Sequence, residues 1–227
     1  MQDKMKRLGS ISNIQSVTDQ AYKIIKEAII SLKLRPGQRL KESLLSNQLQ
    51  ISTTPIRGAL TQLQQEGLVK IIPFKGAFVA EIDDRDVEEI FELRELLEGA
   101  AVKRAAITFA SEDLQQGEAL LEEMREAYKT GDMESYARAS RDFHVLFIEK
   151  FGNQRMISAL KTFDDQLERV RITAIRTVEN IPLFIKDYAK ILESLKAKNP
   201  GEAERVLFVH LKRAKDAFSK SRGHIRS

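Results

Sequence analysis

The chain has 227 residues, of which 42% are hydrophobic, and its formal net charge is +4. This length fits one large domain or two ordinary ones, and the apolar content can build real cores, which excludes disorder as the main state. No apolar stretch approaches the roughly 20 residues of a membrane helix, and the charged N-terminus does not have a signal peptide's apolar region. We therefore expect a cytoplasmic protein that makes no membrane contact. The chain contains no cysteine, which excludes disulfides, thiolate nucleophiles and cysteine-ligated metals.

The basic residues are concentrated in the N-terminal part of the chain. Residues 1–80 carry 12 Lys or Arg and 5 Asp or Glu, a net charge of +7, which leaves −3 for the remainder. A polyanion such as DNA would be attracted to the basic part. Many basic surfaces are simply solvated, so the charge alone does not establish a nucleic-acid partner.

The first third of the chain predicts short helices. Residues 1 to about 10 mix Lys, Gly and Ser without a period, which predicts a loose arm. From Val17 the apolar residues follow helical spacing, and Arg35-Pro36-Gly37 ends this first helix because Pro lacks a backbone donor and Gly tolerates a positive φ. A short helix fits residues 42–49.

A third helix begins in Ser52-Thr53-Thr54-Pro55, where three hydroxyl side chains that can cap a helix precede a Pro of the first turn. Gly67 ends it. Two β-prone runs follow, at residues 68–72 and 77–80, on either side of Pro73-Phe74-Lys75-Gly76. Three helices followed by a two-stranded wing predict a winged helix-turn-helix.

From Asp83 onward the strand signals disappear and long helical patterns replace them. We therefore predict a mainly α protein, with a winged helix-turn-helix DNA-binding domain at residues 1–82 and an all-helical domain at residues 83–227. No internal repeat at a solenoid period is evident, which favours a compact bundle. We assign His224 to a C-terminal tail. After a first helix that begins at Asp83, the predicted helices cover residues 112–129, 133–151, 154–177, 183–198 and 201–220.

The third helix and the wing carry the predicted DNA contacts. In a helix-turn-helix the second helix of the motif enters the major groove, where its N-terminal residues meet base edges. Arg57 lies one turn into this helix, where its planar guanidinium can reach a guanine or a phosphate. The alternative is that the hydroxyls only cap the helix and Arg57 is a solvated charge. The predicted DNA-binding residues are Ser52, Thr53, Thr54, Arg57, Lys75 and Gly76.

This part of the chain resembles the GntR family of transcription regulators. The resemblance combines turn, helix, helix and wing in order, in the segments LRPGQRLKE at 34–42, ISTTPIRGAL at 51–60, GLV at 67–69 and KGAFV at 75–79. It implies a homodimer that binds a palindromic double-stranded operator. Two positions depart from the family, which commonly has Arg in place of Thr53 and Glu in place of Gly58. The departure implies that one charged DNA contact is missing.

The second half resembles the helical ligand-binding domain of the FadR subfamily within that family. The similar segments are FELRELLE at 91–98, DFH at 142–144 and FGN at 151–153, followed by His210 in a late helix. The resemblance implies a bundle of six or seven helices around a polar cavity that binds a carboxylate or sugar-acid effector. It also implies a metal held by one Asp and three His.

The metal ligands of that subfamily are incomplete in this chain. Ser140 stands where the Asp is expected, and Tyr188 stands where the second His is expected, whereas His144 and His210 keep their places. Asp142 lies only two residues before His144, about 200° around the helix, so it should point elsewhere. We therefore predict no metal cofactor.

The same positions predict a site that holds a small carboxylate effector directly. Arg94 can bind an acidic ligand, with a structural pair to Glu98 one turn away as the alternative. Each His can also be an ordinary hydrogen-bonded core residue. The predicted effector-binding residues are Arg94, Ser140, His144, Tyr188 and His210.

The two resemblances together imply a DNA-binding transcription repressor whose operator affinity is controlled by a small organic-acid or sugar-acid effector. Two other functions compete with this one. Ser140 and His144 are one turn apart and suggest nucleophilic catalysis, but neither a third member nor an oxyanion hole is visible, so we expect no enzyme. The alternative is a dimeric DNA-binding regulator without an effector, in which the helical domain serves only dimerisation.

Overall fold

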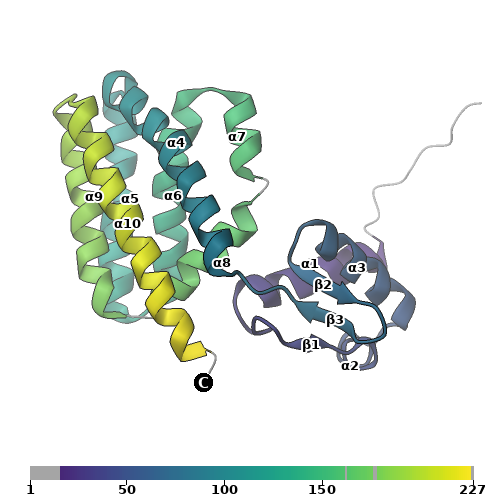
Figure 1. Cartoon of the computed structure of the whole chain (residues 1–227). Coiled ribbons are helices and arrows are strands. Elements are labelled where there is room, and N and C mark those ends of the chain that lie inside the picture. The colour runs from purple at the N-terminus through teal and green to yellow at the C-terminus, as the bar shows by residue number, and fades with distance from the viewer. Residues whose placement is uncertain (1–15, 162, 176–177, 226–227) are drawn as a thin grey trace, which may run out of the picture. The chain divides into compact units, whose positions relative to one another are not determined.

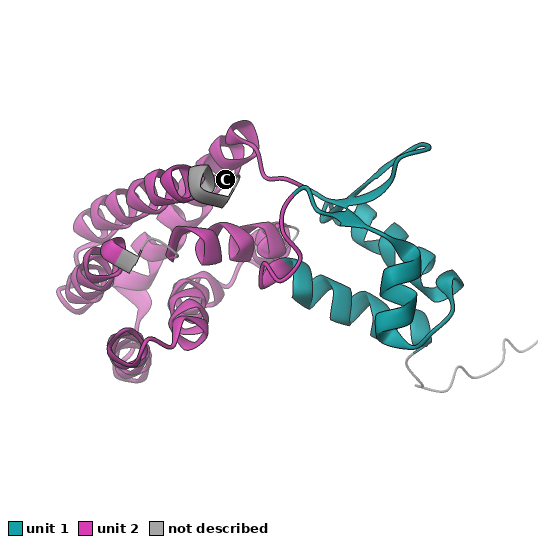
Figure 2. Ribbon diagram, turned by 90° about the horizontal axis from the view of Figure 1, so that it is seen from below, with its two compact units in different colours: residues 1–29, 37–80 teal, residues 30–36, 81–227 magenta. Residues whose placement is uncertain are grey.

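Figure 1 shows the computed structural model, which describes residues 16–161, 163–175 and 178–225. The predicted N-terminal arm lies outside these residues. The chain divides into two compact units, which Figure 2 colours separately: residues 1–29 with 37–80, and residues 30–36 with 81–227. The first is the winged helix-turn-helix unit and the second is the helical unit.

The three helices of the first unit lie where the sequence predicts them. They are α1 (Val17–Ile30), α2 (Glu42–Leu49) and α3 (Thr53–Gln65). The first helix ends before the predicted Arg35-Pro36-Gly37 segment, and Leu32 just beyond it has a positive φ of 59°. Apolar side chains from the three helices, including Ile25, Ile56 and Leu60, are buried together in the core of this unit.

The wing is a three-stranded antiparallel sheet in the order β1-β3-β2. Strands β2 (Val69–Ile72) and β3 (Gly76–Val79) form the predicted hairpin. The third strand, β1 (Arg39–Leu40), was not predicted, because two residues are too short to show a period. Leu40 of this strand is buried, which anchors the edge of the wing on the core.

The helical unit contains α4 (Asp84–Thr108), α5 (Ser111–Thr130), α6 (Met133–Phe151), α7 (Gln154–Lys161), α8 (Asp164–Ile175), α9 (Ile181–Lys196) and α10 (Pro200–Ile225), with a short 3-10 turn at Val178–Asn180. A capping box between Asp83 and Asp86 starts α4. Gly131 and Gly152 end α5 and α6 in the left-handed conformation.

Two predictions for this unit were wrong in detail. The predicted helix at 154–177 is two helices, α7 and α8, which a turn at Phe163 separates. No Gly or Pro marks this break. The helical spacing of apolar residues continues across it, so the sequence pattern predicted a single helix. The last helix continues to Ile225, which makes the backbone at His224 helical rather than a tail. The side chain of His224 lies outside the described residues.

The core of the helical unit is formed largely by α4, α6, α9 and α10. Helices α4 and α10 run side by side in opposite directions, and α5 lies against α6 and α9. Among the described residues, no helix is both long and apolar enough to span a membrane. The bundle places several polar side chains in its interior, where the candidate effector site lies.

Candidate functional site

The N-terminal turn of α3 presents exposed polar side chains. Ser52 and Thr54 are exposed, Thr53 is half-buried, and the Arg57 side chain is 69% exposed. Ser52 occupies the N-cap position, but its hydroxyl makes no capping hydrogen bond. This leaves the hydroxyl available to an outside partner such as a phosphate oxygen.

Arg57 is held in position by α2. Its Nε donates a hydrogen bond of 2.6 Å to the Glu42 carboxylate at the start of that helix. The bond uses only Nε, so the two terminal nitrogens of the guanidinium can still donate to a base edge or a phosphate. Glu42, which the sequence analysis did not single out, therefore orients the predicted DNA-reading side chain.

Gly58 has a packing role. A Cβ atom at this position would lie 2.8 Å from the Thr18 methyl group of α1, closer than real contacts allow. Position 58 therefore faces α1, and glycine lets the two helices approach each other. The departure from Glu at this position is explained by packing, whereas its effect on DNA contacts stays a prediction.

The wing carries more basic residues than the sequence analysis selected. Lys75 and Gly76 lie exposed at its tip, as does the fully exposed Phe74. Arg39 of β1 and Lys70 of β2 are both paired with Phe78 of β3, so these three side chains share one face of the sheet. Arg39 was missed because β1 was missed, and only the strand pairing places it beside the wing.

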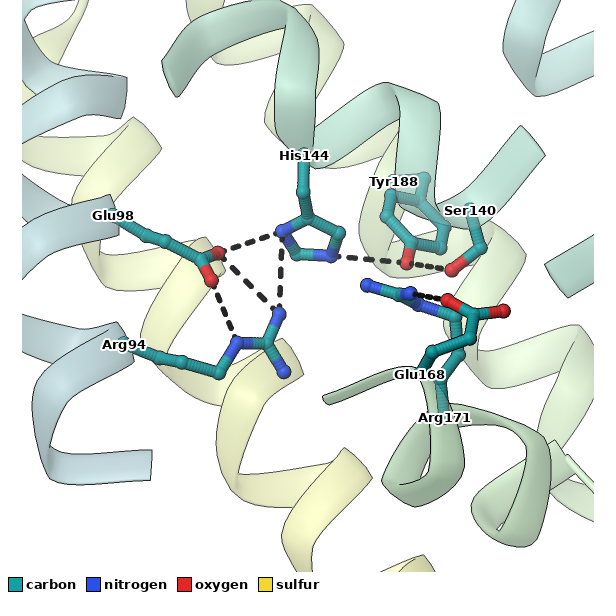
Figure 3. A network of polar contacts seen from close by, with 7 residues as sticks. All are labelled: Arg94, Glu98, Ser140, His144, Glu168, Arg171 and Tyr188. Carbon is teal, nitrogen blue, oxygen red and sulfur yellow. Dashed lines mark hydrogen bonds and ion pairs between the residues drawn. The ribbon is translucent and has the colours of Figure 1, made fainter. Parts of the chain in front are cut away.

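In the helical unit, the five predicted effector-site residues lie together in the interior. Arg94 comes from α4, Ser140 and His144 from α6, Tyr188 from α9 and His210 from α10, and none is more than 5% exposed. Figure 3 shows four of them with Glu98 in one polar network. Their role in binding an effector stays a prediction.

Arg94 forms the structural pair that the sequence left open. Its Nε donates to Glu98 Oε1 at 2.6 Å, and His144 Nδ1 lies 2.7 Å from Glu98 Oε2. Burial by itself would raise the pKa of Glu98, but the charge of Arg94 and the hydrogen bond from His144 outweigh this effect and lower it. Glu98 is therefore ionised and neutralises the charge of Arg94.

A chain of hydrogen bonds runs from Glu98 to Ser140 through His144. Burial lowers the pKa of His144 to about 4, against the opposing influence of Glu98, so its ring is neutral near pH 7. The ring then donates from Nδ1 to Glu98, and Nε2 accepts from the Tyr188 hydroxyl at 3.1 Å. The Ser140 hydroxyl lies 2.7 Å from that of Tyr188 and completes the chain.

The residues at the predicted ligand positions do not fit the metal that the resemblance implies. Among the residues that the structure describes, no three His, Cys, Asp or Glu side chains are arranged to hold an ion. Ser140 and Tyr188 are hydrogen-bonded to each other, and Asp142 points to an exposed pair with Arg141. The Glu98 carboxylate beside His144 is already paired with Arg94, and the two neutral imidazoles that remain are a poor set of ligands for zinc.

A small cavity adjoins this network between α4, α6, α8, α9 and α10. Its volume of about 30 Å³ holds roughly two water molecules, so an organic acid needs the walls to move. Tyr136 and His210 line it, and within the described residues the buried Tyr136 hydroxyl and His210 Nδ1 make no hydrogen bond. Unpaired buried polar atoms are costly, which makes these two atoms available to a ligand.

Arg171 of α8 lines the cavity as a second arginine beside Arg94, and the sequence analysis missed it. It is paired with Glu168 on the same helix, as Figure 3 shows. Its charge acts on the pKa of Tyr136, His144, Tyr188 and His210. No local pattern identifies Arg171, because a predicted helix over 154–177 does not reveal which face meets the core.

Arg171 and His144 also line a second cavity of about 90 Å³, on the side of α6, α7 and α8. Apolar side chains such as Val145, Ile148 and Leu167 form much of its wall. A movement of Arg171 away from Glu168 would therefore enlarge the space beside the polar network on both sides.

Comparisons with known proteins match both units. Residues 17–79 match the model of "Bacterial regulatory proteins, gntR family", and residues 89–213 match that of the FCD domain. The chain is 33% identical to the HTH-type transcriptional regulator McbR of Escherichia coli (strain K12) over 187 residues, which cover 81% of this chain and 84% of McbR. It is 24% identical to the HTH-type transcriptional repressor RspR of the same strain over 208 residues, covering 92% of this chain and 91% of RspR.

A solved structure agrees with these matches. The structure titled E. coli McbR/YncC superposes with a TM-score of 0.74 at 25% identity, covering 91% of this chain and 99% of that one. The superposition includes both units, so the likeness extends to the helical bundle around the polar network.

Proposed function

Because the chain belongs to the GntR family of bacterial regulatory proteins and carries an FCD domain, we propose that it is a cytoplasmic transcription repressor controlled by a small carboxylate effector. We assign it to the FadR subfamily. The matched families and relatives are transcription regulators, which agrees with the prediction that the chain is not an enzyme.

DNA binding is assigned to the domain predicted at residues 1–82, which contains the winged helix-turn-helix unit, and effector binding and dimerisation to residues 83–227. In the first unit, α3 and the wing bind a palindromic operator as a homodimer. Support comes from the exposed Arg57 and from the basic wing residues Arg39, Lys70 and Lys75. Arg57 donates hydrogen bonds to a base edge or to a phosphate, and the exposed hydroxyls at the start of α3 bind phosphate oxygens.

A single observation carries the effector proposal, namely the polar atoms without a hydrogen bond that line the cavity beside the half-buried Arg171. Arg171 supplies the charge for a carboxylate, and the Tyr136 hydroxyl and His210 Nδ1 make no hydrogen bond among the described residues. The Asp187 carboxylate lies 3.9 Å from His210 Nδ1, beyond hydrogen-bond distance. The hydroxyls of Ser140 and Tyr188 can bind further oxygens of a hydroxy-acid. Arg94 holds Glu98 through two nitrogens and both side chains are buried, whereas Arg171 holds Glu168 through Nη1 alone in a less buried pair, so we assign the main electrostatic contact to Arg171.

A thermal-shift screen of small organic acids tests this proposal. A ligand that binds only the folded protein increases the free energy of unfolding, by about 2.7 kcal/mol when its concentration is 100 times its Kd. The melting temperature rises as a result. We expect at least one hydroxy-acid to stabilise the protein, and Arg171→Gln to abolish the shift. Arg125→Gln is the matched control, because Arg125 forms a similar pair with Glu122, three residues away, on the surface of α5.

The control of DNA binding is tested separately. An effector that changes the spacing or mobility of the paired N-terminal units moves them out of register with the two half-sites, so we expect it to release the operator in gel-shift titrations. Specific operator binding with no response to any acid would instead favour the alternative, a dimeric regulator without an effector.

A further inference from the structure

The tip of the wing carries a fully exposed phenylalanine. Phe74 lies in the turn between β2 and β3, and Figure 2 shows this hairpin projecting from the helices of the first unit. Among the large apolar side chains described in this unit, the next most exposed is Leu44, at 55%. A phenylalanine ring contributes stability by leaving water, so the Phe74 ring does not stabilise the fold of this chain.

The backbone at Phe74 is also unfavourable for a phenylalanine. The Lys75 N–H donates to the Ile72 carbonyl at 3.1 Å and closes a four-residue turn. Pro73 is the second residue of this turn and Phe74 is the third, with a φ of 62°. A Pro followed by a residue with positive φ is the pattern of a type II turn, in which Gly or Asn is the usual third residue. A bulky side chain is strained there, so the ring lies where folding alone favours a smaller residue.

Positive charges lie beside the ring. Lys75 follows it in the turn, and a Cβ atom built at Gly76 would lie 3.7 Å from Arg39 Nε, so the Arg39 guanidinium reaches the tip as well. Within the part of the chain that the structure describes, neither cation forms an ion pair with an acidic side chain. Residues 67–80 contain no Asp or Glu. An exposed ring beside two such cations is suited to a polyanion that also offers apolar surface, as the stacked bases of DNA do.

The minor groove of DNA fits a single side chain of this kind. When α3 occupies the major groove, a wing of the same unit that crosses the sugar–phosphate backbone meets the adjacent minor groove. This groove is only about 6 Å wide, so a side chain enters it more easily than a strand or a helix does. Proteins that insert an apolar side chain between two base pairs there unstack the step and kink the duplex.

We propose that Phe74 enters the minor groove of the operator as an apolar wedge and unstacks one base step beneath each wing. Lys75 and Arg39 bind phosphates at the rims of the groove and hold the ring in place. The wedge favours steps that unstack readily, above all the pyrimidine–purine steps TA and CA. The inference rests on the proposed DNA binding, to which it adds a residue and a mode of sequence recognition.

Substitutions at Phe74 test the wedge, with a duplex that the unchanged protein selects from a random library as the probe. We expect Phe74→Asn to lower the affinity roughly 10- to 100-fold, because each wing of a dimer loses a buried ring. Phe74→Leu keeps an apolar wedge and should retain most of the affinity. The control is Leu183→Asn, which removes an exposed leucine from α9 of the helical unit and should bind normally.

Two further measurements separate the wedge from a structural or an electrostatic role. Asn tolerates the left-handed conformation better than Phe, so Phe74→Asn should not lower the melting temperature even though it weakens DNA binding. The substitution removes no charge, so the slope of log K against log salt should stay the same. Lys75→Ala, by contrast, should make this slope shallower.

The fluorescent base 2-aminopurine reports the unstacking itself, because its emission rises when it leaves the base stack. In a series of selected duplexes, each with a different adenine replaced, the emission should rise at the steps beneath the wings with the unchanged protein and not with Phe74→Asn.

The proposal is overturned if Phe74→Asn binds the duplex as tightly as the unchanged protein, which would leave the ring to a protein partner. It is also overturned if no position in the fluorescent series responds. Both results leave the proposed DNA binding intact, whereas a protein that selects no duplex from the library contradicts the DNA binding and the wedge together.

Discussion

The first unit and the helical unit place their functional residues in opposite environments. Arg57 and Lys75 are exposed on a short helix and a turn, whereas Arg94, Glu98 and His144 are buried where several helices meet. An exposed basic side chain needs only the correct local element to reach its target. A buried polar group needs every neighbour to be placed before its charge and hydrogen bonds are settled.

The largest expected effect concerns the exposed site. We expect Arg57→Ala to abolish specific operator binding, a loss of more than roughly 100-fold, because two arginines per dimer lose a base or phosphate contact. The fold and the dimer should be intact, since the side chain is exposed. A footprinting experiment measures the effect.

Two further variants sharpen this result. Arg57→Lys keeps the charge but loses the planar fork, so it separates base reading from phosphate binding. Arg125→Ala removes a charge from the helical unit and should bind normally. A normal footprint with Arg57→Ala would show that the exposed arginine is only solvated.

The buried site should respond to acid. The folded pKa of His144 is lowered to about 4, so below its unfolded value of about 6.5 the unfolded chain binds a proton that the folded chain does not. This favours unfolding as the pH falls, and we expect a loss of roughly 2 kcal/mol of stability between about pH 7 and pH 5. Burial also lowers the pKa of His210, which acts in the same direction.

Denaturant unfolding at several pH values measures this loss. His144→Gln should make the dependence shallower. Titration of the His144 ring by NMR gives an independent measurement that needs no variant. A midpoint near 6.5 in the folded protein would contradict the proposed neutral ring.

The wing should contribute a smaller, electrostatic effect. Operator affinity should fall steeply with salt, and Lys75→Ala should make the slope of log K against log salt shallower by about one for each wing. Lys129→Ala on α5 removes an exposed lysine from the helical unit and should leave the slope unchanged. A salt-independent affinity would argue against electrostatic DNA binding altogether.

The smallest expected signal is the metal content of the purified protein, which should be close to zero. Elemental analysis of protein prepared without chelator or affinity-column metal measures it. Ser140→Asp combined with Tyr188→His restores the carboxylate and the imidazole, and we expect this double variant to gain zinc binding. Near-stoichiometric zinc, nickel or manganese in the unchanged protein, lost in His144→Ala, would reveal a ligand that we have not recognised.

Local sequence patterns were enough to predict the elements of the first unit. Helix α2 lies at the predicted residues, α3 begins within the predicted Ser52–Pro55 segment, and the hairpin encloses Lys75. Caps, turns and periodicity act over a few residues, so local pattern is enough to place these side chains. The resemblance to a known family added the positions of His144, Tyr188 and His210.

The partners of the buried residues depend on how whole helices pack and could not be predicted from local patterns. From the sequence, Arg94 could pair with Glu98 or bind an effector. In the structure α6 packs beside α4, so that His144 contacts the same Glu98 carboxylate that Arg94 binds. Arg171 became a cavity residue because α8 turns away from α7 at a break without Gly or Pro. Arg39 joined the wing through a strand of two residues. In each case the deciding contact joins residues far apart in the chain, and the packing of whole elements, rather than any local preference, brings them together.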